Sequence, residues 1–193
     1  MDSLVHNISS QIVYLNGYAA PDSVRNIDVG YWYANTVGRS LNKLMSPKIL
    51  ETAFYTTLQE FPIFVGYIQA DAHRRVYVDV NSEALNMPVY ADTSSDLDYL
   101  TLCKAGFNIH KLPADPRGEN RILTYPRLSV VDQNPAYFHV LRLRDNTGIL
   151  VYANIPHCFV DGYGFTLFME RWMEILNQMQ QPQANASTEQ PLS

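Results

Sequence analysis

A histidine and an aspartate stand four positions apart where an apolar run gives way to a helical pattern. They are His157 and Asp161, and Gly162 follows directly. An imidazole suits proton abstraction because its ordinary pKa of about 6.5 leaves a neutral, basic form at working pH. Asp161 is close enough to steady the turn, either directly or by pairing with an arginine elsewhere. Gly162 permits a close backbone pass or a positive φ, so the pattern predicts a general base held by its own backbone.

Other chemistries for this segment have less support. Cys158 adjoins His157, but neighbours in an extended segment point in opposite directions, which disfavours a Cys–His dyad. His and Asp are common metal ligands, yet no third or fourth ligand stands nearby, so we expect no metal site. A lone histidine after a strand is more often structural than catalytic, and Asp161 could simply cap the following helix. The remaining histidines have no evident partners and are expected to be structural or exposed: His6, His73, His110 and His139.

The elements before His157 read as a β-hairpin. Residues 137–144 and 148–155 are two strand-like runs, separated by a short stretch of turn-forming residues. Arg142 and Arg144 alternate along the first run, which predicts that one face of it meets water. The second run is apolar almost throughout and is expected to be central and covered on both faces. Pro156 cannot donate a ladder hydrogen bond and marks where strand pairing stops.

A helix is expected after the motif, because apolar residues recur there at helical spacing. This places His157 at the carboxyl end of a buried strand, just before a packed helix. Rigid scaffolds usually present reacting groups at such strand ends. The apolar stripe itself is interpreted as core packing: Phe165, Phe168, Met169, Trp172, Leu176 and Met179.

Upstream, strand-like and helical patterns alternate. Residues 27–37, 64–70 and 76–80 are strand-like. Ser46 followed by Pro47 is typical of a helix start, a capping side chain before a residue with a preset φ. The helix that follows has one apolar face: Ile49, Leu50, Ala53, Phe54, Thr57, Leu58 and Phe61.

A further short helix is expected near residue 100. Ser94 or Ser95 could cap it, with Asp96 and Asp98 in its first turn, where carboxylates complement the helix dipole. Gly106 would end it. These residue types therefore predict a helix that begins after Ser94 or Ser95 and ends at Gly106, before the long loop.

Two segments lack regular patterns. Proline and glycine interrupt residues 111–127, which are expected to form a long surface loop and could border a substrate channel. Residues 180–193 are polar and low in complexity, which indicates a flexible linker or tail. Residues 1–179 are expected to form one domain.

Composition narrows the class of protein. At 193 residues and 47% hydrophobic content, the chain can bury a substantial core. A formal charge of -5 argues against a nucleic-acid surface, which needs clustered Lys and Arg. The N-terminus has Asp2 and no basic region followed by an apolar core, so no signal peptide is expected, and no run approaches the roughly 20 apolar residues of a membrane helix. Cys103 and Cys158, both in apolar settings, fit a reduced compartment, so a cytoplasmic protein with no membrane partner is expected.

Residues 157–162 resemble the HxxxDG signature of the acyl-CoA-dependent BAHD acyltransferases, which belong with chloramphenicol acetyltransferase and the condensation domains of peptide synthetases. The resemblance in the order of elements extends from about Leu41 to a helix ending near Met179. Within it, residues 61–68 are similar to the family's F-P-x-x-x-G segment. Where many members carry a second histidine before the catalytic one, this chain has Pro156, which departs more from the condensation-domain pattern than from the BAHD pattern.

The resemblance implies a fold, a reaction and site roles. The implied fold is α/β (α+β), a chloramphenicol acetyltransferase-like two-layer sandwich whose mixed sheet carries helices on one face. His157 would be the general base, Asp161 a structural brace that pairs with an arginine, and Gly162 the turn. The implied reaction transfers an acyl group from acyl-CoA, as co-substrate, to a hydroxyl or less readily an amine of a small molecule, in secondary metabolism. No bound cofactor is implied.

Length separates this chain from the family. BAHD enzymes have two similar halves, and their second half carries a DFGWG-like motif that is absent here. The chain therefore resembles the N-terminal half, with the C-terminal half as expected partner and source of oxyanion and CoA contacts. Two alternatives are a single-domain trimeric enzyme like chloramphenicol acetyltransferase, and a non-catalytic binding domain that retains the fold. The acceptor and the acyl chain length are not specified by the sequence.

Overall fold

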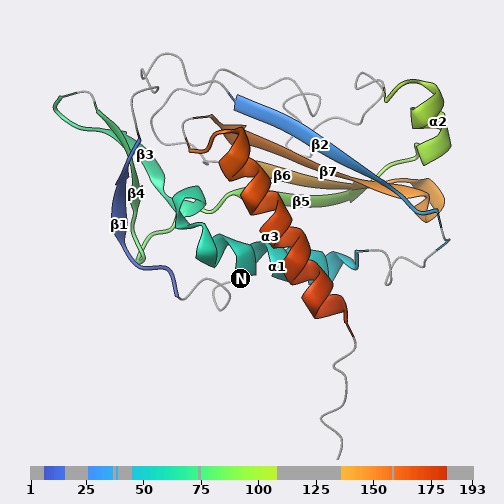
Figure 1. Ribbon diagram of the computed structural model, residues 1–193, viewed down its shortest axis with the longest axis horizontal. Coiled ribbons are helices and arrows are strands. Elements are labelled where there is room, and N and C mark those ends of the chain that lie inside the picture. The colour runs from blue at the N-terminus through green and yellow to red at the C-terminus, as the bar shows by residue number, and fades with distance from the viewer. Residues whose placement is uncertain are drawn as a thin grey trace, which may run out of the picture.

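The computed structural model describes residues 7–15, 26–36, 38, 45–73, 75–107, 136–157 and 159–181, and the statements below concern these residues. They form seven strands, three α-helices and two short 3₁₀ helices (Figure 1). In chain order these are β1 (Gln11–Tyr14), β2 (Asn26–Ala34), α1 (Pro47–Glu60), η2 (Pro62–Val65), β3 (Tyr67–Ala70), β4 (Val76–Val80), β5 (Val89–Ser94), α2 (Tyr99–Lys104), β6 (Tyr137–Arg142), η4 (Arg144–Asn146), β7 (Gly148–Pro156) and α3 (Gly162–Gln180).

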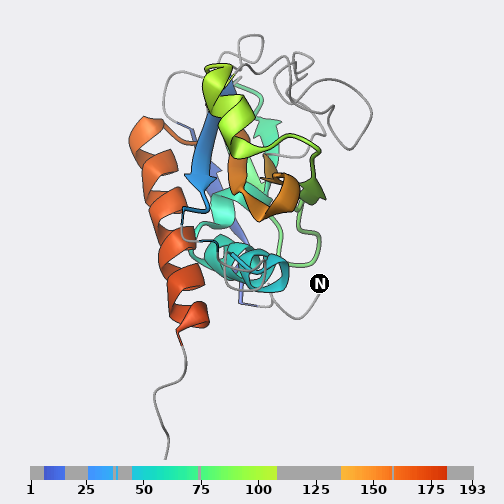
Figure 2. The same cartoon turned by 90° about the vertical axis from the view of Figure 1, so that its right-hand side faces the viewer.

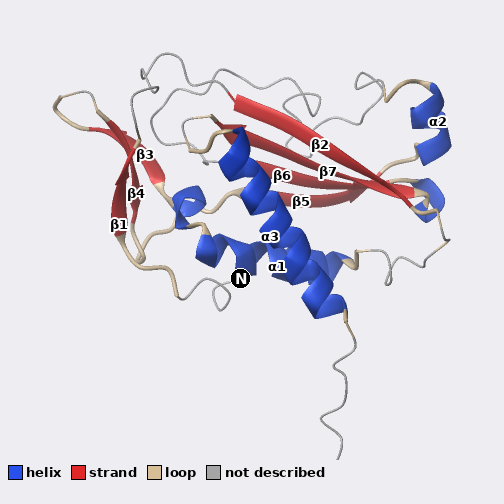
Figure 3. Cartoon of the chain, viewed as in Figure 1, coloured by secondary structure: helices blue, strands red, loops and turns tan. Residues whose placement is uncertain are grey.

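The strands form two separate sheets (Figure 3). The larger sheet has the order β2-β7-β6-β5, and the smaller has the order β1-β4-β3. β7 pairs antiparallel with β2 and β6, while β5 runs parallel to β6, so the larger sheet is mixed. All nine residues of β7 are buried. The prediction of a central strand covered on both faces, ended by Pro156, is confirmed.

The two long helices cover one face of this sheet. Side chains from alternate β7 positions, such as Val151 and Ala153, share the main core with α1 and α3. The short α2 packs at the other face, where Leu102 meets Leu141 and Leu150. Figure 2 shows α3 flanking the sheet, with α1 and α2 on opposite sides of it. The expected mixed sheet under packed helices is confirmed, with α2 added to the second face.

Aromatic rings fill the core between α1, α3 and the sheet. The ring of Phe54 lies 5.1 Å from that of Trp172 and 4.8 Å from that of Phe138, centroid to centroid. The Trp172 indole N–H donates to the Leu50 carbonyl at 3.0 Å, which satisfies a buried donor. The predicted stripe on α3 is buried, except that Met179 is 39% exposed near the helix end. α3 extends to Gln180, one residue into the expected tail, and residues 182–193 lie outside the described residues.

The β6–β7 hairpin turns through two residues in the left-handed region. Asp145 has φ 54° and Asn146 has φ 57°, a conformation that Asp and Asn tolerate better than most side chains. Gly148 lies just after the turn. Any larger residue would clash there, because a Cβ would lie 2.7 Å from the Tyr33 carbonyl oxygen. The predicted hairpin is confirmed, and its glycine is explained by the close approach of β2.

The prediction that Arg142 faces water is wrong. Arg142 is 6% exposed, and its guanidinium forms two hydrogen bonds of 2.7 Å with the carboxylate of Asp92. Asp92 comes from β5, the parallel neighbour of β6. A buried arginine is tolerated there because the adjacent strand supplies its counter-charge. Arg144 is exposed as expected, but it lies in η4 and not in the strand.

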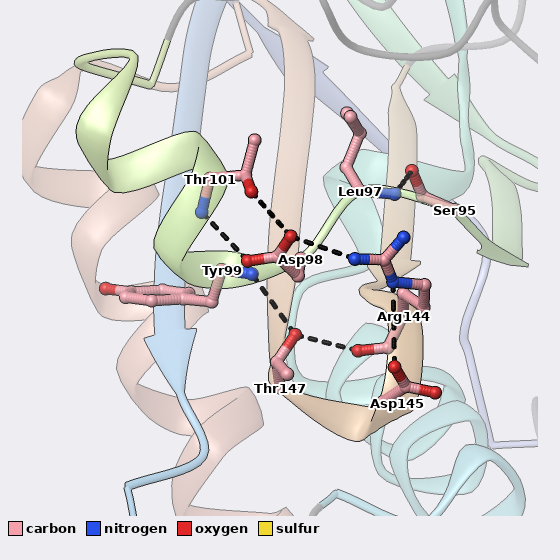
Figure 4. A network of polar contacts seen from close by, with 8 residues as sticks. All are labelled: Ser95, Leu97, Asp98, Tyr99, Thr101, Arg144, Asp145 and Thr147. Atoms are coloured by element: carbon pink, nitrogen blue, oxygen red, sulfur yellow. Dashed lines mark hydrogen bonds and ion pairs between the residues drawn. The ribbon is translucent and has the colours of Figure 1, made fainter.

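The predicted start of the short helix is wrong by several residues. Asp98 is its N-cap: one carboxylate oxygen accepts from the Thr101 N–H at 2.8 Å and the other from the Thr101 hydroxyl at 2.6 Å (Figure 4). These hydrogen bonds lower the pKa of Asp98. Ser94 remains in β5, and the Ser95 hydroxyl accepts from the Leu97 N–H instead. Gly106, with φ 62°, follows the helix end as expected.

Polar contacts join α2 to the hairpin turn (Figure 4). The Tyr99 N–H donates to the Thr147 hydroxyl at 3.1 Å, and that hydroxyl donates to the Arg144 carbonyl at 2.8 Å. Arg144 also reaches the Asp98 carboxylate at 3.2 Å. These contacts fix α2 beside the β6–β7 turn. This turn lies at the start of β7, and His157 follows the other end of that strand.

Other boundaries differ modestly from expectation. Pro47 begins α1 as predicted, but the Ser46 side chain makes no capping hydrogen bond. The strand expected over 64–70 begins only at Tyr67, because residues 62–65 form η2. β1 and β5 were not predicted from the sequence. The loop expected over 111–127 lies outside the described residues.

Candidate functional site

The turn between β7 and α3 presents His157 on a rigid base. The Phe159 N–H donates to the Pro156 carbonyl at 2.9 Å, closing the turn directly after the strand. Phe159 is 5% exposed and packs against Phe64, with ring centroids 6.2 Å apart. His157, two residues earlier, is exposed. A buried ring therefore anchors the turn, and the imidazole remains accessible from outside the chain.

Asp161 caps the helix that follows. Its Oδ1 accepts from the Gly164 N–H at 2.8 Å, and its carbonyl accepts from the Phe165 N–H at 3.0 Å. Such a cap satisfies one of the N–H groups left free at the start of a helix. In the part of the chain that the structure describes, no ion pair includes Asp161. Within the described residues, the carboxylate caps α3 and has no arginine partner.

Gly162 is the first residue of α3. Its φ lies outside the left-handed region, and a Cβ placed there would meet no atom within 4 Å. Neither of the reasons expected for a glycine, a positive φ or a close backbone pass, applies within the described chain. Among the described residues, the space around Gly162 at the start of α3 is therefore open.

A second polar group lies near the same strand end and was not found from the sequence. Asp28 of β2 accepts hydrogen bonds on Oδ1 from the Tyr152 hydroxyl, at 2.8 Å, and from the Asn154 side-chain amide. Tyr152 is 2% and Asn154 3% exposed, whereas Asp28 is exposed. A sequence signal did exist, because Asn154 is the one side-chain amide in an otherwise apolar run. Its partner, 126 positions away, could not be inferred from spacing.

The other histidines lie elsewhere. His139 in β6 is 1% exposed and its Nε2 lies 2.6 Å from the Thr93 hydroxyl, so the expectation that it has no partner is wrong. His73 is exposed in the β3–β4 turn, as expected. His6 and His110 lie outside the described residues.

The structure places no metal-binding cluster in the described part of the chain. No group of three or more His, Cys, Asp or Glu side chains is arranged to hold an ion among those residues. Cys103 is exposed on α2, contrary to the apolar setting expected for it, and carries a free thiol. Cys158 lies outside the described residues. None of the described helices is both long and apolar enough to cross a bilayer.

Comparison with known proteins shows which fold the chain shares but assigns it to no family. No protein-family model matches the chain, and no curated protein matches it. Solved structures do match. TRI101 of F. sporotrichioides, complexed with coenzyme A and T-2, superposes with a TM-score of 0.60 at 15% identity, covering 88% of this chain and 41% of that one.

Two further structures agree. TRI101 of F. graminearum, complexed with ethyl coenzyme A, has a TM-score of 0.63 at 11% identity, covering 88% of this chain and 39% of that one. The starter condensation domain of the rhizomide synthetase RzmA has a TM-score of 0.57 at 14% identity, covering 88% and 36%. The fold is therefore that of the chloramphenicol acetyltransferase-like proteins, as predicted. The chain spans about two-fifths or less of the length of these neighbours.

Proposed function

We propose that this chain is the N-terminal, histidine-bearing half of an acyl-CoA-dependent acyltransferase of the BAHD type. The observation that carries the proposal is the exposed His157 at the end of a fully buried central strand. Phe159 anchors its turn to the core and Asp161 caps the next helix. The similarity of the fold to that of TRI101 supports the same proposal.

The proposed reaction is direct acyl transfer with His157 as general base. The neutral imidazole removes the proton of an acceptor hydroxyl, or less readily of an amine, while that oxygen or nitrogen forms a bond to the thioester carbonyl carbon. The carbon–sulfur bond then breaks, and the imidazolium returns its proton to the CoA thiolate. No covalent acyl-enzyme forms. The tetrahedral oxyanion needs hydrogen-bond donors, and we assign these to the other half of the enzyme.

The neighbours support the substrate classes. TRI101 structures hold coenzyme A together with T-2 or deoxynivalenol, which are small-molecule ligands. By analogy we propose acyl-CoA as co-substrate and a small-molecule alcohol as acceptor. A place in secondary metabolism and in the cytoplasm belongs to the same proposal, and the free thiol of Cys103 is compatible with a reducing compartment.

The surface beside His157 supports a covering second half. Tyr163 is 73% and Leu167 40% exposed, and residues four apart on a helix lie on the same side. These two apolar side chains form a strip on α3 that begins just after the catalytic turn. Large exposed apolar side chains grouped near a site often mark an interface. Together with the length of the neighbours, this favours a two-half enzyme over a single-domain trimer.

The test compares two histidine variants in an assembled two-half enzyme by thiol release from acyl-CoA. His157→Ala is expected to lower turnover about 10²-fold or more, the usual contribution of a general base. His73→Ala replaces a matched exposed histidine in the β3–β4 turn of the smaller sheet and should leave turnover unchanged. Full activity of His157→Ala would end the assignment. Sedimentation of this chain tests the alternative, because a stable trimer would favour the single-domain enzyme.

A further inference from the structure

The two carboxylate oxygens of Asp28 differ in their hydrogen bonds. Oδ1 accepts from both Tyr152 and Asn154. Among the described residues, no hydrogen bond or ion pair includes Oδ2, and the side chain is exposed. Both donors are more than nine-tenths buried, so they hold the carboxylate in one orientation. The free oxygen is thus presented to solvent by a fixed support.

The sheet register places Asp28 at the same end of the strand pair as His157. Asp28 pairs with Asn154 and Asn26 pairs with Pro156, so the start of β2 runs beside the end of β7. His157 is three residues beyond Asn154, which corresponds to about 10 Å at the rise of a β-strand. β2 is also the outermost described strand on that side of the sheet. An exposed carboxylate and an exposed imidazole therefore lie at one end of the same strand pair.

A carboxylate held in this way is suited to bind a hydrogen-bond donor. Hydrogen bonds to an ionised acceptor are shorter and stronger than those between neutral groups. Because Tyr152 and Asn154 already fix the carboxylate, binding does not have to restrict its rotation, which favours affinity. No described cation neutralises it: Arg142 is paired with Asp92 and Arg144 with Asp98. The partner that fits is a hydroxyl or ammonium group of a ligand.

We propose that Asp28 is an acceptor-binding residue, whose free Oδ2 accepts a hydrogen bond from a second donor group of the acceptor. The reacting hydroxyl lies at His157 and the second hydroxyl or ammonium at Asp28, and the backbone positions that carry them are about 10 Å apart along the strand direction. The enzyme would then select acceptors with two donor groups over those with one. This inference rests on the proposed function for the role of His157, but the binding of a donor group by Asp28 does not.

The kinetic test uses two alcohols that differ in one donor. 1,8-Octanediol carries a second hydroxyl, and 8-methoxyoctan-1-ol carries a methyl ether in its place. In the assembled enzyme, the diol is expected to have a KM about tenfold lower than the ether, on the scale of one hydrogen bond to a charged group. Asp28→Asn keeps an acceptor for Tyr152 and Asn154 but replaces Oδ2 with an amide nitrogen. It should abolish the difference in KM between the two alcohols.

A matched control separates binding from fold. Asp145→Asn changes an exposed carboxylate at the opposite end of the β6–β7 hairpin and should retain the preference for the diol. A purely structural role of Asp28 would raise KM equally for both alcohols and lower the thermal midpoint. Equal KM values for the two alcohols in the wild-type enzyme, or an unchanged preference in Asp28→Asn, would overturn the inference.

A binding measurement on this chain alone does not depend on acyl transfer. The side-chain amide signals of Asn154, which donates to Asp28, are followed by ¹H–¹⁵N NMR as each alcohol is added. The diol is expected to shift these signals, and the ether to shift them less. Asp28→Asn should remove that difference. If no acyl transfer occurs but the diol-specific shift remains, the proposed function fails and the assignment of Asp28 stands. If neither alcohol shifts the signals, or both do so equally, the assignment of Asp28 is wrong.

Discussion

The ring of Phe159 lies against the ring of Phe64, with centroids 6.2 Å apart, and this contact fixes the turn that carries His157. Phe64 itself is fully buried in η2 and also contacts Phe168 of α3 at 4.7 Å between centroids. The turn is thus attached to the core through a side chain two residues after the imidazole. The packing of Phe159 therefore helps to fix the position of His157.

Replacing Phe159 with alanine should destabilise the chain and loosen this turn. Loss of a buried phenylalanine side chain typically costs about 3–5 kcal/mol of unfolding free energy. The measurement is chemical denaturation of the purified chain. Tyr163→Ala removes a ring of similar size that is 73% exposed, and it should change stability by no more than about 0.5 kcal/mol. Equal effects of the two substitutions would show that Phe159 does not anchor the turn.

Substitutions of Asp161 distinguish helix capping from ion pairing. Asp161→Ala removes the acceptor for the Gly164 N–H and should cost about 1 kcal/mol of unfolding free energy. Asp161→Asn keeps an oxygen at the same place, and asparagine is as good an N-cap as aspartate. We therefore expect Asp161→Asn to retain nearly wild-type stability in denaturant unfolding. A loss as large as that of the alanine variant would indicate that the negative charge, and not the cap, is what the chain requires.

Local signals in the sequence were sufficient for the elements around the site. Pro47 begins α1, two residues tolerant of positive φ form the hairpin turn, and an unbroken apolar run identifies β7 as central. Each of these depends on neighbouring residues, which a sequence displays directly. The same holds for Asp161, whose position before a helical pattern predicts a cap.

Features that depend on distant partners were missed or misread. The alternation of Arg142 and Arg144 suggested a solvent-exposed strand face. Nothing in the local sequence reveals that Asp92, 50 positions earlier on the parallel strand β5, pairs with Arg142. β5 is defined by that pairing, and its own residues 89–94 carry little strand pattern. Asp28 likewise acquires its meaning only from the β2–β7 register. Periodicity reports which face of an element is buried, but not which strand lies beside it.

The Arg171–Glu60 pair predicts a pH dependence of stability. Hydrogen bonds of 2.7 Å from Arg171 lower the pKa of Glu60 below its ordinary value of 4.5. A carboxyl with a depressed folded-state pKa contributes stability that is complete above the unfolded pKa and is lost as the pH falls through the folded pKa. The unfolding free energy of the wild type should exceed that of Glu60→Gln by a constant amount above about pH 5.5, one unit over that ordinary value. The gap should shrink as the pH falls below 4.5. A gap that is independent of pH would exclude an electrostatic origin.

The Arg142–Asp92 pair should behave differently when one member or both members are replaced. Asp92→Asn leaves the guanidinium of Arg142, 6% exposed, without its counter-charge, and should cost about 3 kcal/mol of unfolding free energy. Replacing both residues, as Arg142→Met with Asp92→Val, removes the two charges together and fills the space with apolar groups. Because such exchanges of a buried pair are often neutral, the double variant should recover most of the lost stability in denaturant unfolding. If the double variant were less stable than Asp92→Asn, the pair would be contributing net stability, and its two hydrogen bonds would outweigh the cost of removing both ions from water.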